Sequence, residues 1–443
     1  MVKFLRNIFY ILVFIAIFIN SAQEVNAIYD PLSVPNNIYG IGIINHSDLD
    51  DVNLLVNSSN GKWGYVTVVI TEKERSKEIW QSFFDECRRK NIIPIVRVAS
   101  SFENGNWKIP DLNEIDNWVI FFDTLNWVIE NRYVIIGNEP NHAKEWGGKI
   151  DPENYAKYLK EFSTKLKSSN KDYYVLNAGF DQDAPTGKVT MDQKKYLERM
   201  LKAEPDIFNY IDGWNSHSYP NPAFSGSKLR IGRGTIKGYE WELEYLQSLH
   251  IVKDLPIFIT ETGWKKTKNN SDLIADNMEY AYKEIWSKNS KVVAVTPFIL
   301  NYQQEPFKEF SWKEKDSFST IFDRVKNLQK IKGEPKQKIS GVIIFKFISP
   351  LVFRNTEYKG ITLVRNTGQA IWLQSDSQVV DLKEGSVIKV SNTKFTPIEP
   401  FKTGLVVFTL TSLNKAESNI VKIGLFVKGE KIGDIFNGKI ISF

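Results

Sequence analysis

The amino-acid sequence predicts an α/β fold, a (β/α)8 barrel followed by a smaller all-β sandwich. Its 443 residues suit two or three domains of ordinary size. As far as Val325, short apolar runs alternate with helical patterns, which is the rhythm of βα units. Beyond that point the helical pattern stops, and short β-rich runs separated by turn residues follow.

Residues 1–27 have the layout of a secretory signal. Lys3 and Arg6 precede an unbroken apolar run of 12 residues, 8–19, and small residues follow up to Ala27. The run is shorter than the roughly 20 residues that span a bilayer. We therefore expect a secreted, extracellular protein. An uncleaved signal that anchors the chain in a membrane is the alternative.

Composition excludes several classes of protein. The 57 Lys and Arg against 52 Asp and Glu give a net charge of +5, which does not suit a strongly basic nucleic-acid binder. Cys87 is the single cysteine, so no intrachain disulfide and no cysteine-based metal cluster can form. The four histidines leave little material for a histidine-rich metal site. We expect no nucleic-acid partner, no metal and no organic cofactor.

Eight apolar runs are the predicted strands of the barrel. They begin about 25–45 residues apart, the size of a βα unit. Each run is continuous rather than alternating, as in parallel strands that are covered on both faces. The runs are 38–44, 65–70, 92–98, 133–136, 174–178, 211–216, 256–259 and 292–298.

The stretches between these runs predict amphipathic helices. Residues 76–91, 154–169 and 271–290 each place apolar residues three and four positions apart, with a polar opposite face. A doubly wound open sheet is the rival architecture. It usually has fewer strands and a Gly-rich phosphate loop, whereas the first run, which contains Gly40 and Gly42, continues without that fingerprint.

The C-terminal part predicts a β-sandwich over 338–443, joined to the barrel, 28–330, by a charged segment near 325–338. Residues 338–443 contain 14 Lys and Arg against 8 Asp and Glu. This surplus is either a solvated face or a means of association with an anionic cell wall or membrane surface. The predicted strands are 341–348, 360–365, 387–390, 404–411 and 420–427.

Two glutamates follow the predicted strands at the positions where such a barrel carries its active site. Glu139 comes just after the fourth run and Glu261 just after the seventh. Active sites of these barrels lie at the C-terminal ends of the strands, and strands 4 and 7 lie across the opening from each other. A pair of carboxyl groups on one ligand is the arrangement that hydrolyses a glycosidic bond.

Other strand ends carry side chains that suit the same chemistry. Arg97 ends the third run and can keep a carboxylate ionised. His217 and Tyr219 follow the sixth run, where they can bond a carboxyl group or a sugar hydroxyl, and Asn138 precedes Glu139. Aromatic side chains near the predicted mouth suit stacking on sugar rings. They are Trp146, Trp214, Trp264, Tyr302 and Trp312.

Asn138-Glu139-Pro140 after strand 4 and Thr-Glu-Thr-Gly-Trp at 260–264 after strand 7 resemble motifs of a known superfamily. It is the (β/α)8 clan A of retaining glycoside hydrolases, which includes cellulases, mannanases and xylanases. The resemblance, over residues 37–325, implies that Glu139 is the general acid/base and Glu261 the nucleophile. It also implies that Asn138 binds the sugar 2-hydroxyl, and that Arg97, His217 and Tyr219 belong to the site.

Two further comparisons concern the eighth strand and the C-terminal part. Many clan A members place a Trp at the end of strand 8, whereas this chain has none there, so Phe298, Tyr302 or Trp312 would form the sugar subsite. The segment 365–372 resembles an immunoglobulin-like accessory domain. Within it, Trp372 is predicted to be a core residue, with an exposed sugar platform as the alternative.

These observations predict a secreted, monomeric, retaining O-glycoside hydrolase that acts on β-linked polysaccharides or oligosaccharides. Retention predicts carboxyl groups roughly 5–5.5 Å apart, and a separation beyond about 6.5 Å would exclude it. A non-catalytic carbohydrate-binding barrel or surface adhesin is one alternative. An inverting or transglycosylating enzyme on the same barrel is another.

Overall fold

A computed structural model describes residues 28–315, 317–383, 388–412 and 418–443. The predicted signal, 1–27, lies outside the described residues, as does the first residue of the strand predicted at 387–390. Among the described helices, none has the length and apolar character needed to cross a membrane.

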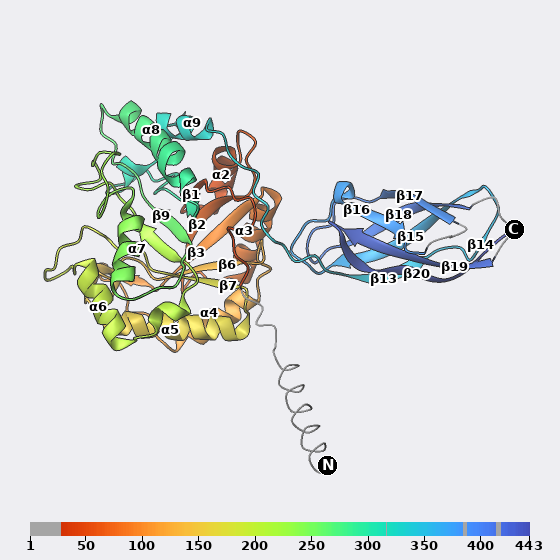
Figure 1. Ribbon diagram of the computed structural model, residues 1–443, viewed down its shortest axis with the longest axis horizontal. Coiled ribbons are helices and arrows are strands. Elements are labelled where there is room, and N and C mark those ends of the chain that lie inside the picture. The colour runs from red at the N-terminus through yellow and green to blue at the C-terminus, as the bar shows by residue number, and fades with distance from the viewer. Residues whose placement is uncertain (1–27, 316, 384–387, 413–417) are drawn as a thin grey trace, which may run out of the picture.

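Eight parallel strands form the N-terminal unit (Figure 1). Five pair in the order β1-β2-β3-β6-β7 and three in the order β10-β9-β8. Parallel bridges from Tyr39 to Val295 and from Leu176 to Gly213 join the two sheets at both seams, so the barrel closes. The strands are β1 (Gly40–Gly42), β2 (Gly64–Thr71), β3 (Ile92–Ala99), β6 (Arg132–Ile136), β7 (Tyr173–Asn177), β8 (Trp214–His217), β9 (Ile257–Glu261) and β10 (Val292–Val295).

Helices surround these strands and bury their apolar stripes against them (Figure 1). Ser76, Asp151 and Asp192 accept bonds from backbone N–H groups at the N-termini of α3, α5 and α6, as capping residues do. The helix predicted over 271–290 is α8 followed by a π-helical turn and a 3-10 turn. The α-helices are α2 (Leu49–Val56), α3 (Lys77–Arg89), α4 (Glu114–Asp123), α5 (Pro152–Ser169), α6 (Gln193–Ala203), α7 (Gly238–Ser248), α8 (Ser271–Tyr280) and α9 (Thr320–Lys326).

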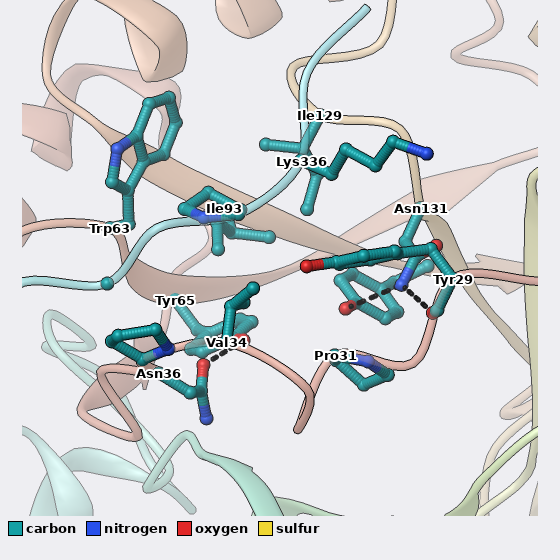
Figure 2. A pocket seen from close by; sticks show the side chains of 14 residues that line it. Tyr29, Pro31, Val34, Asn36, Trp63, Tyr65, Ile93, Ile129, Asn131 and Lys336 are labelled. Carbon is teal, nitrogen blue, oxygen red and sulfur yellow. Dashed lines mark hydrogen bonds between the residues drawn. The ribbon is translucent and has the colours of Figure 1, made fainter.

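The N-terminal end of the barrel is filled. Inside it, the ring of Tyr133 packs against those of Tyr174 and Phe258, at 5.2 and 5.1 Å between centroids. Figure 2 shows the small pocket below, where the Asn131 side chain donates a hydrogen bond to the Tyr29 carbonyl at 2.8 Å. The pocket also includes Lys336 from the segment after α9, and its volume of about 10 Å³ is at most enough for one water molecule.

Two four-stranded sheets form the C-terminal part, in the orders β13-β15-β18-β17 and β14-β20-β19-β16. They enclose a second hydrophobic core, in which Trp372 is fully buried, so Trp372 is a core residue and not a sugar platform. The strands that the sequence did not predict are β14, β16 and β20. The elements are β13 (Gly341–Phe347), β14 (Leu351–Val352), β15 (Glu357–Asn366), β16 (Ser377–Asp381), β17 (Ile388–Lys394), β18 (Thr403–Ser412), β19 (Ser418–Val427) and β20 (Glu430–Ser442).

The C-terminal part contacts the barrel at the N-terminal ends of the strands. Gln369 donates to the carbonyl of Ile129, in the loop that enters β6, at 2.8 Å. Arg89, the last residue of α3, forms a bidentate ion pair with Glu399, with N···O distances of 2.7 and 3.1 Å. These contacts leave the opposite end of the barrel, at the C-terminal ends of its strands, free of the sandwich.

Candidate active site

The two predicted glutamates meet at the C-terminal end of the barrel. Glu139 follows β6, and Glu261 is the last residue of β9. His217, the last residue of β8, lies between them: its Nδ1 is 2.9 Å from Glu139 Oε1 and 3.7 Å from Glu261 Oε2. One oxygen from each carboxylate and the imidazole nitrogen all lie within 4.8 Å of one another. The two carboxyl groups can therefore act on the same bond of a ligand, one at each of its atoms.

The backbone after β6 turns sharply to aim Glu139 into the mouth. Gly137 has φ +88° and Glu139 itself has φ +29°, in the left-handed region that non-glycine residues seldom adopt. The Glu139 N–H donates to the Gly179 carbonyl at 3.0 Å, and its own carbonyl accepts from the His142 N–H at 2.8 Å. Such a backbone costs about 1–3 kcal/mol and is typical of functional sites.

Donors on both sides hold Glu261 as a carboxylate. Arg97 Nη1 donates to Oε1 at 2.7 Å, and the Tyr219 hydroxyl donates to Oε2 at 3.1 Å. Burial by itself would raise the pKa of Glu261, but the charges of His217 and Arg97 and these two hydrogen bonds lower it below the usual glutamate range. Glu261 is thus ionised over the pH range in which most proteins work.

His217 is buried, with 2% of its surface exposed. Burial would lower its pKa, but the charge of Glu261 and the bond to Glu139 outweigh burial, so the pKa is raised. The ring lies directly over Gly179: a Cβ atom on that glycine would fall 2.0 Å from His217 Cδ2. A glycine at this position is therefore what allows the imidazole to sit between the carboxylates.

Asn138 is held at both ends of its amide. Its Oδ1 accepts from Arg97 Nη1 at 2.6 Å, and its Nδ2 donates to Glu145 Oε2 at 3.1 Å. One N–H of the amide remains for a ligand. The sequence analysis missed Glu145, although it stands in the same loop as Glu139. Burial and the charge of Glu139 raise the pKa of Glu145 despite the Asn138 bond.

A second histidine–carboxylate pair lies at the rim and was also missed. His142 Nε2 is 2.8 Å from Asp181 Oδ2, and both side chains are about three-tenths exposed. Burial would lower the pKa of His142, but the Asp181 bond and the charge of Glu139 raise it. The position of His142, three residues after Glu139, could have indicated from the sequence that it lies near the site. Its contact with Asp181 depends on the fold.

The predicted sugar contacts of Trp146, Trp214 and Trp264 are wrong. Their exposed fractions are 1%, 0% and 4%, and each indole N–H donates to a protein acceptor. The acceptors are Asn154 Oδ1, Glu242 Oε2 and the Gly226 carbonyl, at 3.1, 3.0 and 2.8 Å. A Trp side chain is stable in a core when its N–H finds a hydrogen-bond partner inside the protein, as each of these three does. Trp312, 2% exposed, is also a core residue.

Other aromatic side chains form a wall beside Glu261. Tyr219, which bonds Glu261, packs on Phe224 with 4.9 Å between centroids. Phe298, after β10, packs on Phe307 at 5.2 Å, and Phe307 packs on Tyr302 at 5.6 Å. Phe310 connects the two groups. Phe298 and Tyr302 are half-buried and Phe307 is exposed. We call these six residues the aromatic wall; it includes the predicted substitutes Phe298 and Tyr302.

Glu139, His217 and Glu261 are the cluster of potential metal ligands that the described residues contain. Arg97 already donates to one oxygen of Glu261, and Tyr219 donates to the other. A cation bound there would share its carboxylate with a guanidinium, and the two positive charges would repel each other. The donor set therefore suits a sugar ligand and proton transfer better than a metal ion.

Comparisons with known proteins give distant likenesses. No family model matches the chain, and no curated protein matches it. Among solved structures, it is similar to a family 51 alpha-L-arabinofuranosidase from Bifidobacterium longum, with 10% identity over 87% of this chain and 98% of that one, and a TM-score of 0.40.

Two shorter enzymes are similarly distant. A beta-1,4-D-mannanase from Cryptopygus antarcticus shares 12% identity over 66% of this chain and 90% of its own, with a TM-score of 0.41. A family 5 xyloglucanase from Paenibacillus pabuli shares 13% identity over 69% of this chain and 91% of its own, also with a TM-score of 0.41. At such values the likenesses decide neither fold nor activity.

Proposed function

We propose that this protein is a secreted retaining O-glycoside hydrolase that acts on β-linked polysaccharides or oligosaccharides. The observation that carries the proposal is the meeting of Glu139 and Glu261, with one oxygen of each within 4.8 Å of the other. Inverting enzymes keep their carboxyl groups roughly 6.5–9.5 Å apart to hold a water molecule between them and the sugar. The short separation here supports direct attack by one carboxylate.

The surroundings of the two glutamates distinguish their roles. Glu261 is the nucleophile, because Arg97, Tyr219 and His217 favour its ionised form. Glu139 is the acid/base; its side chain is 23% exposed against 15% for Glu261, which suits a group that faces the leaving sugar and water. Exchange of a proton by such a group contributes about 10²–10⁴-fold to the rate.

The reaction takes two displacements. In the first, a Glu261 oxygen bonds to the anomeric carbon, the glycosidic C–O bond breaks, and Glu139 gives its proton to the leaving oxygen. In the second, Glu139 takes a proton from water, the water oxygen bonds to the anomeric carbon, and Glu261 leaves as a carboxylate. His217, which bonds Glu139, and Arg97, which bonds Glu261, keep the two groups in place.

Asn138 and the aromatic wall supply the sugar contacts. The free N–H of Asn138 suits a hydroxyl next to the anomeric carbon, since Asn138 directly precedes Glu139. Phe298, Phe307 and Tyr302 give apolar surface beside Glu261 for the C–H face of a pyranose. The scheme needs no group from a second chain, so a monomer is sufficient for it.

Release of reducing ends from soluble β-glucans, mannans, xylans and galactans tests the activity. Wild type should release them, whereas Glu139→Ala and Glu261→Ala should not. Glu103→Ala, which removes an exposed carboxylate, is the control and should match wild type. The anomeric form of the first product, followed by NMR, should be β. An initial α product would show inversion, and tight glycan binding without release by wild type would show a non-catalytic barrel.

A further inference from the structure

The outer surface of the sheet β13-β15-β18 is apolar where a sandwich sheet is usually polar. The pairing of the three strands aligns their outward-facing apolar residues in two rows. Phe345 pairs with Leu363, and Leu363 pairs with Leu405. In the next row Phe347 pairs with Ile361, and Ile361 pairs with Val407. We call these six residues, on three adjacent strands, the apolar face.

The apolar face is open to solvent in the described chain. Phe345 is 52% exposed, Phe347 55% and Leu405 50%. Their inward-facing neighbours on β15 and β18, such as Val364 and Val406, are fully buried, so the sandwich core does not need the apolar face for its own packing. A contiguous exposed apolar surface of this kind marks an interaction site.

Basic side chains border the apolar face on the same side of the sheet. Arg365 and Lys359 lie on β15 at either end of its apolar residues, and Lys389 and Lys394 lie on β17. Lys394 stands directly beside Val407. Among the ion pairs between described residues, none includes any of these four cations, and Glu357 is the acidic residue of β15 on this side. The face therefore presents a net positive charge, four cations against one carboxylate, around an apolar centre.

We propose that the apolar face docks on an anionic lipid bilayer surface, with Phe345 and Phe347 entering the headgroup region and the four cations contacting acidic headgroups. An apolar centre bordered by Lys and Arg is the chemistry that binds such an interface. The proposal is independent of the glycosidase activity. It assigns part of the basic surplus of residues 338–443 to one surface.

Other occupants fit the face less well. A second copy placed face to face would set these cations against an identical set, and the like charges would repel. A polysaccharide stacks on aromatic rings, which only Phe345 and Phe347 of the six residues supply. The other four, Leu363, Leu405, Ile361 and Val407, have none. The sandwich meets the barrel at the N-terminal ends of the barrel strands, so its contact with a membrane does not require the active-site mouth.

Sedimentation with lipid vesicles tests the proposal. The chain from Ile28 onward, the form expected after signal removal, contains both hydrophobic cores complete. It should bind vesicles that contain phosphatidylglycerol, should bind pure phosphatidylcholine far less, and should lose binding as salt rises. The double variant Phe345→Ser/Phe347→Ser should bind at least about tenfold more weakly, because it removes two large apolar groups.

A second variant separates charge from folding. Lys359→Gln/Lys394→Gln changes exposed side chains. It should weaken binding roughly 25-fold, because each cation near an anionic surface contributes about fivefold. Ile420→Ser is the matched control: Ile420 is 55% exposed on β19, in the other sheet, and its loss should leave binding unchanged.

Several results would overturn the proposal. They are absence of binding to anionic vesicles, equal binding by wild type and both double variants, and equal loss with Ile420→Ser. A dimer in solution that Phe345→Ser/Phe347→Ser converts to a monomer would assign the face to a second copy. Retention by a soluble glycan that the same variant abolishes would assign it to a polysaccharide.

Discussion

Arg97 is the residue that connects the two halves of the site. One nitrogen, Nη1, donates to both Asn138 Oδ1 and Glu261 Oε1, at 2.6 and 2.7 Å. The same guanidinium therefore orients the amide that is proposed to bind the sugar and holds the carboxylate that is proposed to attack it. Lysine could supply the charge but not the rigid planar group that fixes both partners.

Substitution of Arg97 should change the pH profile. In Arg97→Met, Glu261 loses a charge and a hydrogen bond that lower its pKa, so its pKa should rise. The reaction requires ionised Glu261, and activity is lost as the pH falls through that pKa. The acidic limb of kcat/KM should therefore move to higher pH. Arg199→Met, which breaks an exposed ion pair between α6 and Glu153 of α5, is the control. An unchanged acidic limb would contradict the assignment of Glu261.

Glu145 acts through Asn138. Glu145→Gln keeps an oxygen that can accept from Asn138 Nδ2, whereas Glu145→Leu leaves that amide free to rotate. We expect the Leu variant to lose about tenfold or more in kcat/KM, the scale of one hydrogen bond in a site, and the Gln variant to lose much less. Steady-state kinetics on both variants tests this. Equal losses would mean that the charge of Glu145, not its position, matters.

At the scale of elements, the end of β7 and the end of β8 must approach closely. Gly179 follows β7, and its missing side chain makes room for His217. Gly179→Ala should displace the imidazole, lower kcat by at least about 10²-fold, and cost about 1–3 kcal/mol in stability through overpacking. Gly187→Ala is the control, because a Cβ there meets its nearest neighbour at 3.8 Å. Thermal unfolding and kcat measure the two effects.

Sequence patterns predicted the barrel elements well because a parallel strand covered on both faces is apolar throughout. All eight predicted runs coincide with strands of the barrel, with small shifts at their ends such as β10, which stops at Val295. The sandwich was harder to predict. β16 (Ser377–Asp381) is mostly polar, and β20 (Glu430–Ser442) contains glycines and charges. Edge and outer positions carry little hydrophobic pattern, so their strands depend on pairing.

At the scale of the whole molecule, few contacts join the barrel to the sandwich. The Arg89–Glu399 pair is exposed by about a third or more on each side, so Glu399→Gln should cost less than about 1 kcal/mol. Gln369 is buried at this junction, and Gln369→Leu would leave the Ile129 carbonyl without its bond. We expect Gln369→Leu to lower the free energy of unfolding by about 1–3 kcal/mol. Calorimetry compares the two variants, and glycosidase activity should persist in both.

The sequence by itself determined which residues stand at the ends of the barrel strands. Glu139, Arg97, His217 and Glu261 each follow or end an apolar run, and strand ends of a closed parallel barrel must meet at one face. This is a local pattern combined with a general rule, so it could be predicted without coordinates.

Only the tertiary structure decided what surrounds these residues. The indoles of Trp146, Trp214 and Trp264 are buried, Glu145 and Asp181 join the site, and the apolar face remains exposed. Each outcome depends on partners distant in sequence. An apolar or aromatic residue has the same pattern whether it is covered or open, and burial is fixed only when another segment packs against it.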